Sequence, residues 1–253
     1  MNPDVEYLLR IADTALIHAQ RLSEWCGHAP ILEEDIALTN MALDLLGQAR
    51  ALLTHAGALE GLGHDEDQLA FLRDERDYRN ATLVELPLKR GGGDFADTML
   101  RNFFVATWFK ALWQRLQSSS DGELAAIAAK ALKEVRYHQQ HAGDWVVRLG
   151  DGTDESAARL RAALDRAWPY VAELFEADAV DDAAVQSRLG PRCSELRDDW
   201  LADVKAVFDD ALLALPADTP FRSSGRGGVH SEHLGYMLAE MQHLQRAYPG
   251  GAW

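Results

Sequence analysis

Two stretches of the sequence come near to a di-iron ligand motif without completing it. Residues 44–48 read Asp-Leu-Leu-Gly-Gln, and residues 133–138 read Lys-Glu-Val-Arg-Tyr-His. A carboxylate-bridged di-iron centre in a four-helix bundle takes one Glu from each of two helices. The other two helices each supply a Glu-x-x-His pair, and all the ligands face inward. Such a centre would activate oxygen, and it depends on these anionic ligands.

Aliphatic residues stand at the carboxylate positions of both stretches. The pairs expected to face inward are Leu45 with Gln48 and Val135 with His138. Glu134 lies about 100° round the helix from Val135, so we do not expect it to take the place of the missing carboxylate. His138 and Gln48 fall on apolar stripes, where a buried imidazole and a buried amide commonly satisfy each other or nearby backbone groups. The spacing therefore predicts a degenerate di-iron site.

The other two helices of such a bundle supply few carboxylates that could act as metal ligands. Glu24 could be the surviving carboxylate of the first helix, although a solvated or salt-bridged Glu at the helix end is an equal alternative. Between Asp97 and Asp121 there is no Asp or Glu at all, so the long helix in this region has no bridging carboxylate to offer. We predict no catalytic, cofactor-binding or metal-binding residue in this chain. The degenerate positions are Glu24, Leu45, Gln48, Val135 and His138.

One literal match to Glu-x-x-His occurs elsewhere, at Glu240 and His243. It falls in a short C-terminal helix and has no second copy to complete a site, so we interpret it as a coincidence. Dinucleotide-binding and Walker glycine motifs are absent, as is the Gly-x-Ser-x-Gly elbow of hydrolases.

The elements that would position these residues are almost all helical. Apolar residues recur at three- and four-residue steps over most of the chain, and no alternating strand pattern is found. The patterns predict a single all-α domain over residues 1–253, an up-down bundle of about seven or eight helices. Residues 222–228, rich in Gly and Ser, are predicted to be a flexible loop before the short C-terminal helix. Helices are expected over residues 5–25, 31–56, 65–86, 95–117, 121–149, 155–176 (with a kink at Pro169), 195–214 and 231–247.

Composition narrows the functional class. The 253 residues carry a formal net charge of −15, which opposes binding to nucleic acid through phosphate contacts. No apolar run approaches the ~20 residues that span a membrane, and the N-terminus lacks the features of a signal peptide. The two cysteines are too few for a disulfide framework. We expect a cytoplasmic protein that binds neither nucleic acid nor membrane.

Two features of the sequence have both a structural interpretation and a partner-binding interpretation. The charged run of residues 73–80 is either a solvated helix face with paired side chains or a surface that recognises a protein partner. Seven Trp residues are many for this length, and some could anchor an interface rather than fill the core.

Several stretches together resemble one known family, the structural, non-catalytic subunits (PaaC) of the bacterial phenylacetyl-CoA 1,2-epoxidases, also called phenylacetyl-CoA oxygenases. They follow the same order over nearly the whole chain, and residues 176–200 and 91–93 are the least similar parts. The matching stretches are residues 21–30, 44–50, 73–76, 80–85, 95–98, 133–138, 233–235 and 237–241.

The resemblance implies a ferritin-like fold and a protein partner. In that family the catalytic subunit holds the di-iron site, which epoxidises the aromatic ring of phenylacetyl-CoA with O2. NADPH supplies the electrons through a reductase subunit that contains flavin and an iron–sulfur cluster. The resemblance therefore implies that this chain has no cofactor, packs against the di-iron subunit and other subunits of the complex, and can form a homodimer when isolated.

Two other functions remain open from the sequence. One is a metal-binding ferritin-like oxidoreductase that uses Glu24, His138 and a carboxylate not yet placed. The other is a ferritin-like storage or scaffold protein without an oxygenase partner.

Overall fold

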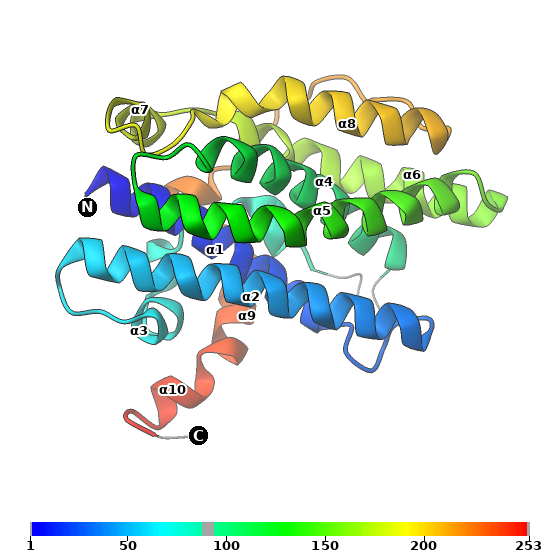
Figure 1. Ribbon diagram of the computed structural model, residues 1–253. Helices are drawn as coiled ribbons and strands as arrows, with labels where there is room; N and C mark the ends of the chain where they lie inside the picture. Colours follow the sequence, from blue (N-terminus) through cyan, green and yellow to red (C-terminus); the bar gives the residue numbers. More distant parts are fainter. Residues whose placement is uncertain (1, 88–93, 252–253) are drawn as a thin grey trace.

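The computed structural model describes residues 2–87 and 94–251 (Figure 1). Within these ranges the chain forms ten α-helices and no strand apart from a single isolated bridge, so the all-α prediction is confirmed. In the described ranges, no helix is both long enough and apolar enough to cross a membrane. The four long helices are α1 (Pro3–Ser23), α2 (Leu32–Glu60), α4 (Phe95–Leu116) and α5 (Gly122–Gly150).

Short connections and local caps set the directions of these four helices. Residues 24–31 join α1 to α2, and residues 117–121 join α4 to α5, so each pair runs antiparallel. The Asp94 and Asp121 side chains cap α4 and α5 by accepting hydrogen bonds from the backbone N–H of Ala96, at 2.9 Å, and of Leu124, at 2.9 Å. Helices α2 and α5 also pack against each other, which closes one side of the bundle (Figure 1).

Helix α4 is the central helix. Its buried residues, which are mostly apolar, lie on every side of the helix rather than along one stripe. It packs against α5 and is also covered by α6 (Asp154–Ala167) and α8 (Arg197–Asp210) (Figure 1). Indole N–H groups fix its backbone to neighbouring segments. Trp200 donates to the carbonyl of Phe104 at 2.9 Å, and Trp108 donates to the carbonyl of Leu174 at 3.1 Å.

Residues 65–86 do not form the single helix that the pattern predicts. They contain α3 (Glu66–Phe71) and two 3₁₀ turns, Glu75–Asp77 and Thr82–Glu85. Buried carboxylates from distant elements take the backbone N–H groups that a helix would use. Asp13 accepts from Arg79 N at 2.8 Å, and Glu173 accepts from Thr82 N at 3.0 Å. These long-range bonds break the helix.

Other predicted helices also divide. Residues 155–176 end as a helix at Ala167 and continue as two 3₁₀ turns, Trp168–Tyr170 and Ala172–Phe175, because Pro169 has no backbone N–H. Residues 231–247 form α9 (Glu232–Met241) and α10 (His243–Ala247). Helix α7 (Ala179–Gln186) was not predicted. The unpredicted α7 and the division of residues 231–247 into two helices account for the ten α-helices of the described ranges, where the patterns predict about seven or eight.

The segment predicted to be a flexible loop, residues 222–228, packs closely against the bundle. It contains a 3₁₀ turn, Gly225–Gly227, in which Arg226 is buried and donates from its backbone N–H to Glu173 Oε1 at 2.9 Å. A Cβ on Gly225 would lie 2.5 Å from the Asn80 carbonyl oxygen, so Gly here permits close packing. The Gly tract at 91–93 lies outside the described residues.

Candidate functional site

The four inward positions of α2 and α5 lie at the centre of the bundle. Leu45, Gln48, Val135 and His138 are each at most 4% exposed. The aliphatic residues therefore occupy the buried positions where the Glu-x-x-His pattern would place carboxylates.

The hydrogen-bond partners of His138 and Gln48 are acids on the facing helix, whereas the sequence-based interpretation expected the two residues to bond to each other or to nearby backbone groups. The His138 Nε2 lies 3.0 Å from Asp44 Oδ2, and the Gln48 Nε2 donates to Glu134 Oε2 at 3.0 Å. Both acids lie one residue beside the apolar stripe of their own helix, which is why we did not expect them. The α2–α5 contact is close enough for each polar group to reach the acid on the opposite helix.

A second buried polar pair links α1 to α4, and the sequence analysis missed it. His18 Nε2 lies 3.1 Å from Asn102 Oδ1, and Asn102 Nδ2 contacts Met41 Sδ at 3.3 Å. Because the Asn102 oxygen can only accept, we assign the proton to His18 Nε2. His18 and Asn102 fall on the apolar stripes of their helices, and this is the signal that could have revealed them.

Burial keeps both central histidines neutral. Loss of solvation lowers the pKa of His18 to about 3, and the nearby Arg101 charge acts in the same direction. Burial also lowers the pKa of His138, although its contact with Asp44 opposes that shift. The two imidazoles are therefore neutral hydrogen-bonding groups at neutral pH.

The remaining candidate residues lie away from this centre. Glu24 is the C-cap of α1 and forms an ion pair with Arg21, with its side chain 38% exposed. Glu240 and His243 are exposed at the junction of α9 and α10. The structure therefore brings together Leu45, Gln48, Val135 and His138, but not Glu24 or the C-terminal pair.

The donor set at the centre does not fit a carboxylate-bridged di-iron centre. Its polar groups are two imidazoles, two amides and a thioether, and its carboxylates, Asp44 and Glu134, lie at the rim and are only partly buried. In residues 2–87 and 94–251, no group of three or more His, Cys, Asp or Glu side chains is arranged to hold a metal ion. These contacts hold α1 to α4 and α2 to α5, which is a structural role.

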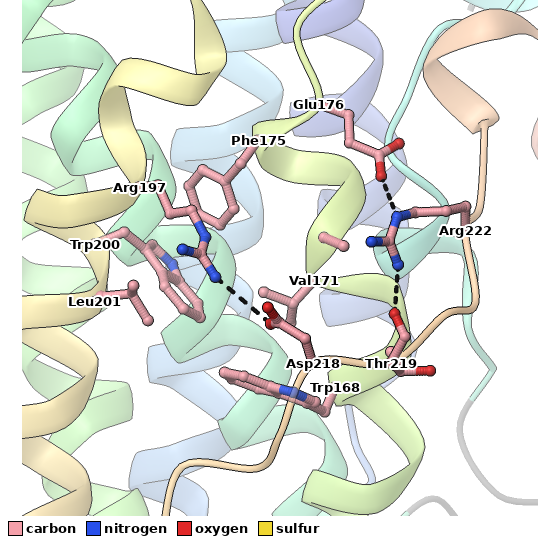
Figure 2. A pocket seen from close by; sticks show the side chains of 11 residues that line it. Trp168, Val171, Phe175, Glu176, Arg197, Trp200, Leu201, Asp218, Thr219 and Arg222 are labelled. Carbon is pink, nitrogen blue, oxygen red and sulfur yellow. Dashed lines mark hydrogen bonds and ion pairs between the residues drawn. The ribbon is translucent and has the colours of Figure 1, made fainter.

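A cavity of about 260 Å³ on another side of the bundle has aromatic walls (Figure 2). Trp168, Phe175 and Trp200 line it, and two ion pairs flank it. Arg197 lies 3.5 Å from Asp218, and Arg222 lies 2.6 Å from Glu176 (Figure 2). Both arginines that line this cavity are therefore paired with acids.

Comparison with known proteins agrees with the resemblance seen in the sequence. The family model described as "Phenylacetic acid catabolic protein" matches residues 1–253. The chain belongs to this family. It is similar to the C subunit of the 1,2-phenylacetyl-CoA epoxidase of Escherichia coli (strain K12), with 49% identity over 253 residues, all of this chain and all of that protein. The resemblance to the epoxidase subunits is thereby confirmed.

In this member of the phenylacetic acid catabolic protein family, the centre of the bundle is closed by side chains. Val135 and Leu45 fill the volume with apolar groups, and the polar residues between them bond to partners on the facing helix. Such contacts between facing helices stabilise the packing of the bundle.

Proposed function

We propose that this chain is the non-catalytic, structural subunit of a multicomponent phenylacetyl-CoA 1,2-epoxidase in aerobic phenylacetate degradation. The full-length similarity to the C subunit of such an epoxidase supports this role. The observation that carries it is the replacement of motif carboxylates by Leu45 and Val135 at the buried centre. Function follows from the site rather than from the fold. For a bundle without these ligands we therefore expect binding of a partner subunit rather than catalysis.

The proposal assigns the cofactors to other subunits of the complex. A catalytic subunit holds the di-iron site, and a reductase subunit passes electrons from NADPH through flavin and an iron–sulfur cluster. This chain stabilises the catalytic subunit in the cytoplasm through helix-on-helix contacts, and it can pair with itself when the partner is absent.

An apolar stripe on the outer face of α2 supports a partner contact. Leu32, Ile36 and Leu43 recur at four- and seven-residue steps, which places them on one face of the helix, and each is more than half exposed. Tyr137 of the adjacent α5 is also more than half exposed. Exposed apolar groups on one helix face are typical of surfaces that a protein partner covers. We assign the catalytic subunit to this stripe, which we call the α2 stripe.

The decisive experiment expresses the catalytic subunit with and without this chain and measures epoxide formation from phenylacetyl-CoA in the presence of the reductase. We expect the chain alone to be inactive, and the catalytic subunit alone to be inactive or unstable. Full activity of the catalytic subunit without this chain would contradict the proposal.

A metal titration separates the proposal from a metalloenzyme. The isolated chain is loaded anaerobically with ferrous iron, and iron per polypeptide is then measured. We expect no stoichiometric iron. Two irons per chain, the content of a di-iron centre, would instead indicate a catalyst. In that case the His138→Ala variant would show whether His138 is a ligand.

A further inference from the structure

An open groove of about 550 Å³ follows the outward side of α2 beside the start of α5. It is lined by residues of α2, among them Gly47 and Ala58, and by Glu123 of α5. Leu43, the last residue of the α2 stripe, lies about one turn before Gly47 and is 59% exposed. The groove therefore extends the α2 stripe along the same helix.

No packing contact within the described residues requires a glycine at position 47. Glycine destabilises the interior of a helix relative to alanine, so its presence there calls for a reason. A Cβ on Gly57 or on Gly150 would overlap a backbone carbonyl oxygen, of His64 and Ala211 respectively. A Cβ on Gly47 would have no described atom within 4 Å, and Gly47 does not have a positive φ. The missing side chain instead leaves the α2 backbone open to approach by another chain.

The adjacent part of α5 presents cations on its outward side. Lys130, Lys133 and Arg136 are exposed at three-residue steps. Among the described residues, Lys133 and Arg136 have no ion pair, and Lys130 has only Glu134 of its own helix, at 3.8 Å. These cations are unpaired although the net charge of the chain is −15. This side of α5 is therefore locally basic on an acidic protein.

The groove and the cations lie at the same level of the bundle. Gln48, which directly follows Gly47, donates to Glu134 Oε2 of α5 at 3.0 Å. Glu134 in turn lies between Lys133 and Arg136 in the sequence. Helices α2 and α5 run side by side in Figure 1. One segment of a partner can therefore contact both features.

We propose that this face holds an amphipathic helix of the catalytic subunit, which packs against the α2 backbone at Gly47 and directs acidic side chains toward Lys133 and Arg136. The inference rests on the proposed function and adds the kind of partner segment and its place. A groove that follows one helix suits a second helix, and the distance between helix axes shortens where the contact residue is small. Charge complementarity favours an acidic segment, because like charges at an interface oppose association.

Two substitutions of Gly47 separate binding from folding. Without a partner, Gly47→Ala should unfold roughly 2–4 °C above the unmodified chain, and Gly47→Leu no lower than it, because both residues are better helix formers and open space surrounds the position. Weaker binding by these variants therefore cannot result from unfolding.

A competition measures the binding, and it does not require the catalytic subunit to be stable alone. The unmodified chain and a variant, with different tags, are co-expressed with the catalytic subunit, and their ratio is measured in the purified complex. The unmodified chain should exceed Gly47→Leu at least about tenfold and Gly47→Ala by less, because the larger side chain keeps the partner helix farther away. The control, Ala202→Leu on α8, adds a Leu at another exposed helix position and should compete equally.

Charge reversal tests the acidic character of the partner. The double variant Lys133→Glu with Arg136→Glu should be at least about tenfold under-represented in the complex, because acids would then face acids. The control, Arg161→Glu, reverses an exposed cation of α6 that likewise has no ion pair among the described residues, and it should compete equally.

The outcomes distinguish this inference from the proposed function. Equal competition by Gly47→Leu or by the double charge variant would overturn the inference alone. If Gly47→Leu competes equally but abolishes a homodimer of the isolated chain, the groove belongs to a second copy, and the inference is again wrong. Failure of the unmodified chain to co-purify with the catalytic subunit would overturn the proposed function and the inference together.

Discussion

His138 of α5 and Asp44 of α2 meet across the bundle, with His138 Nε2 3.0 Å from Asp44 Oδ2. The imidazole is 1% exposed, whereas the carboxylate is 39% exposed. Because burial lowers the pKa of His138, the contact at neutral pH is a hydrogen bond from a neutral imidazole to a partly solvated carboxylate. It joins two helices at the level where a Glu-x-x-His pattern would place ligands.

Substitutions of His138 and of Asp44 should lower the free energy of unfolding by different amounts. His138→Ala leaves a buried cavity and should cost about 2–4 kcal/mol. Asp44→Asn should cost about 1 kcal/mol or less, because the carboxylate is partly solvated. Urea unfolding of both single variants and the double variant gives the coupling between them. Fully additive losses would show that the contact contributes no stability.

The buried His18 should make the protein sensitive to acid. Its pKa is lowered to about 3 in the fold by burial, whereas an unfolded chain has a value near 6.5. The unfolded state therefore binds the proton first as the pH falls. The stability is complete above about pH 6.5 and is lost progressively toward pH 3, by an amount on the order of 5 kcal/mol.

Urea unfolding between pH 7 and pH 4 checks this prediction. His18→Gln keeps an N–H donor for Asn102 but cannot take up a proton, so its stability should fall less steeply with acid than that of the unmodified chain. His28→Gln changes an exposed histidine and serves as the matched control. Parallel acid profiles for His18→Gln and the unmodified chain would contradict the assignment.

His230 should have the opposite dependence on pH. Its ring nitrogens both face oxygen acceptors, with Nδ1 2.6 Å from Glu85 Oε1 and Nε2 3.0 Å from the Tyr78 carbonyl oxygen. Burial alone would lower the pKa of His230, but these contacts, with a smaller contribution from the Glu75 charge, outweigh burial and raise it. The protonated ring satisfies both acceptors, so its stabilisation is complete below about pH 6.5 and is lost as the pH rises through the raised value.

Amide hydrogen exchange in α9 from pH 6 to pH 9 follows this change, because His230 directly precedes Ser231, the N-cap of that helix. After correction for the intrinsic pH dependence of exchange, opening of α9 should increase with pH in the unmodified chain. In His230→Gln the opening should be greater at low pH and nearly independent of pH. A pH-dependent opening that persists in His230→Gln would assign the effect to another group.

The α2 stripe should be needed for assembly with the catalytic subunit. Ile36→Asp and Leu43→Asp place a charge on exposed positions, so each variant should fold normally but lose binding to the catalytic subunit in size-exclusion chromatography. The control, Leu212→Asp, follows α8, on the other side of the bundle from α2 in Figure 1. Retained assembly by both α2 variants would place the interface elsewhere.

The same chromatography distinguishes a self-associating scaffold. If the isolated chain forms a homodimer through the α2 stripe, the Asp variants should be monomers. A large homo-oligomer without affinity for the catalytic subunit would favour the scaffold function over the proposed one.

The sequence by itself determined the helical architecture and the loss of the ligand pattern. Apolar stripes with a 3.6-residue period predict long helices, and they place Leu45 and Val135 inward, because burial of such a stripe depends mainly on local periodicity. The absence of acids between Asp97 and Asp121 is likewise visible without a structure. The family resemblance followed from stretches spread over nearly the whole chain.

Only the tertiary structure decided which polar groups meet. The bond between His18 and Asn102 joins residues far apart in the sequence, and Asp13 breaks the expected helix over 65–86 by bonding to Arg79. The periodicity of apolar residues indicates which face of a helix is buried. The partner of a buried polar group depends on helix crossing and side-chain reach, which are set when the whole bundle packs.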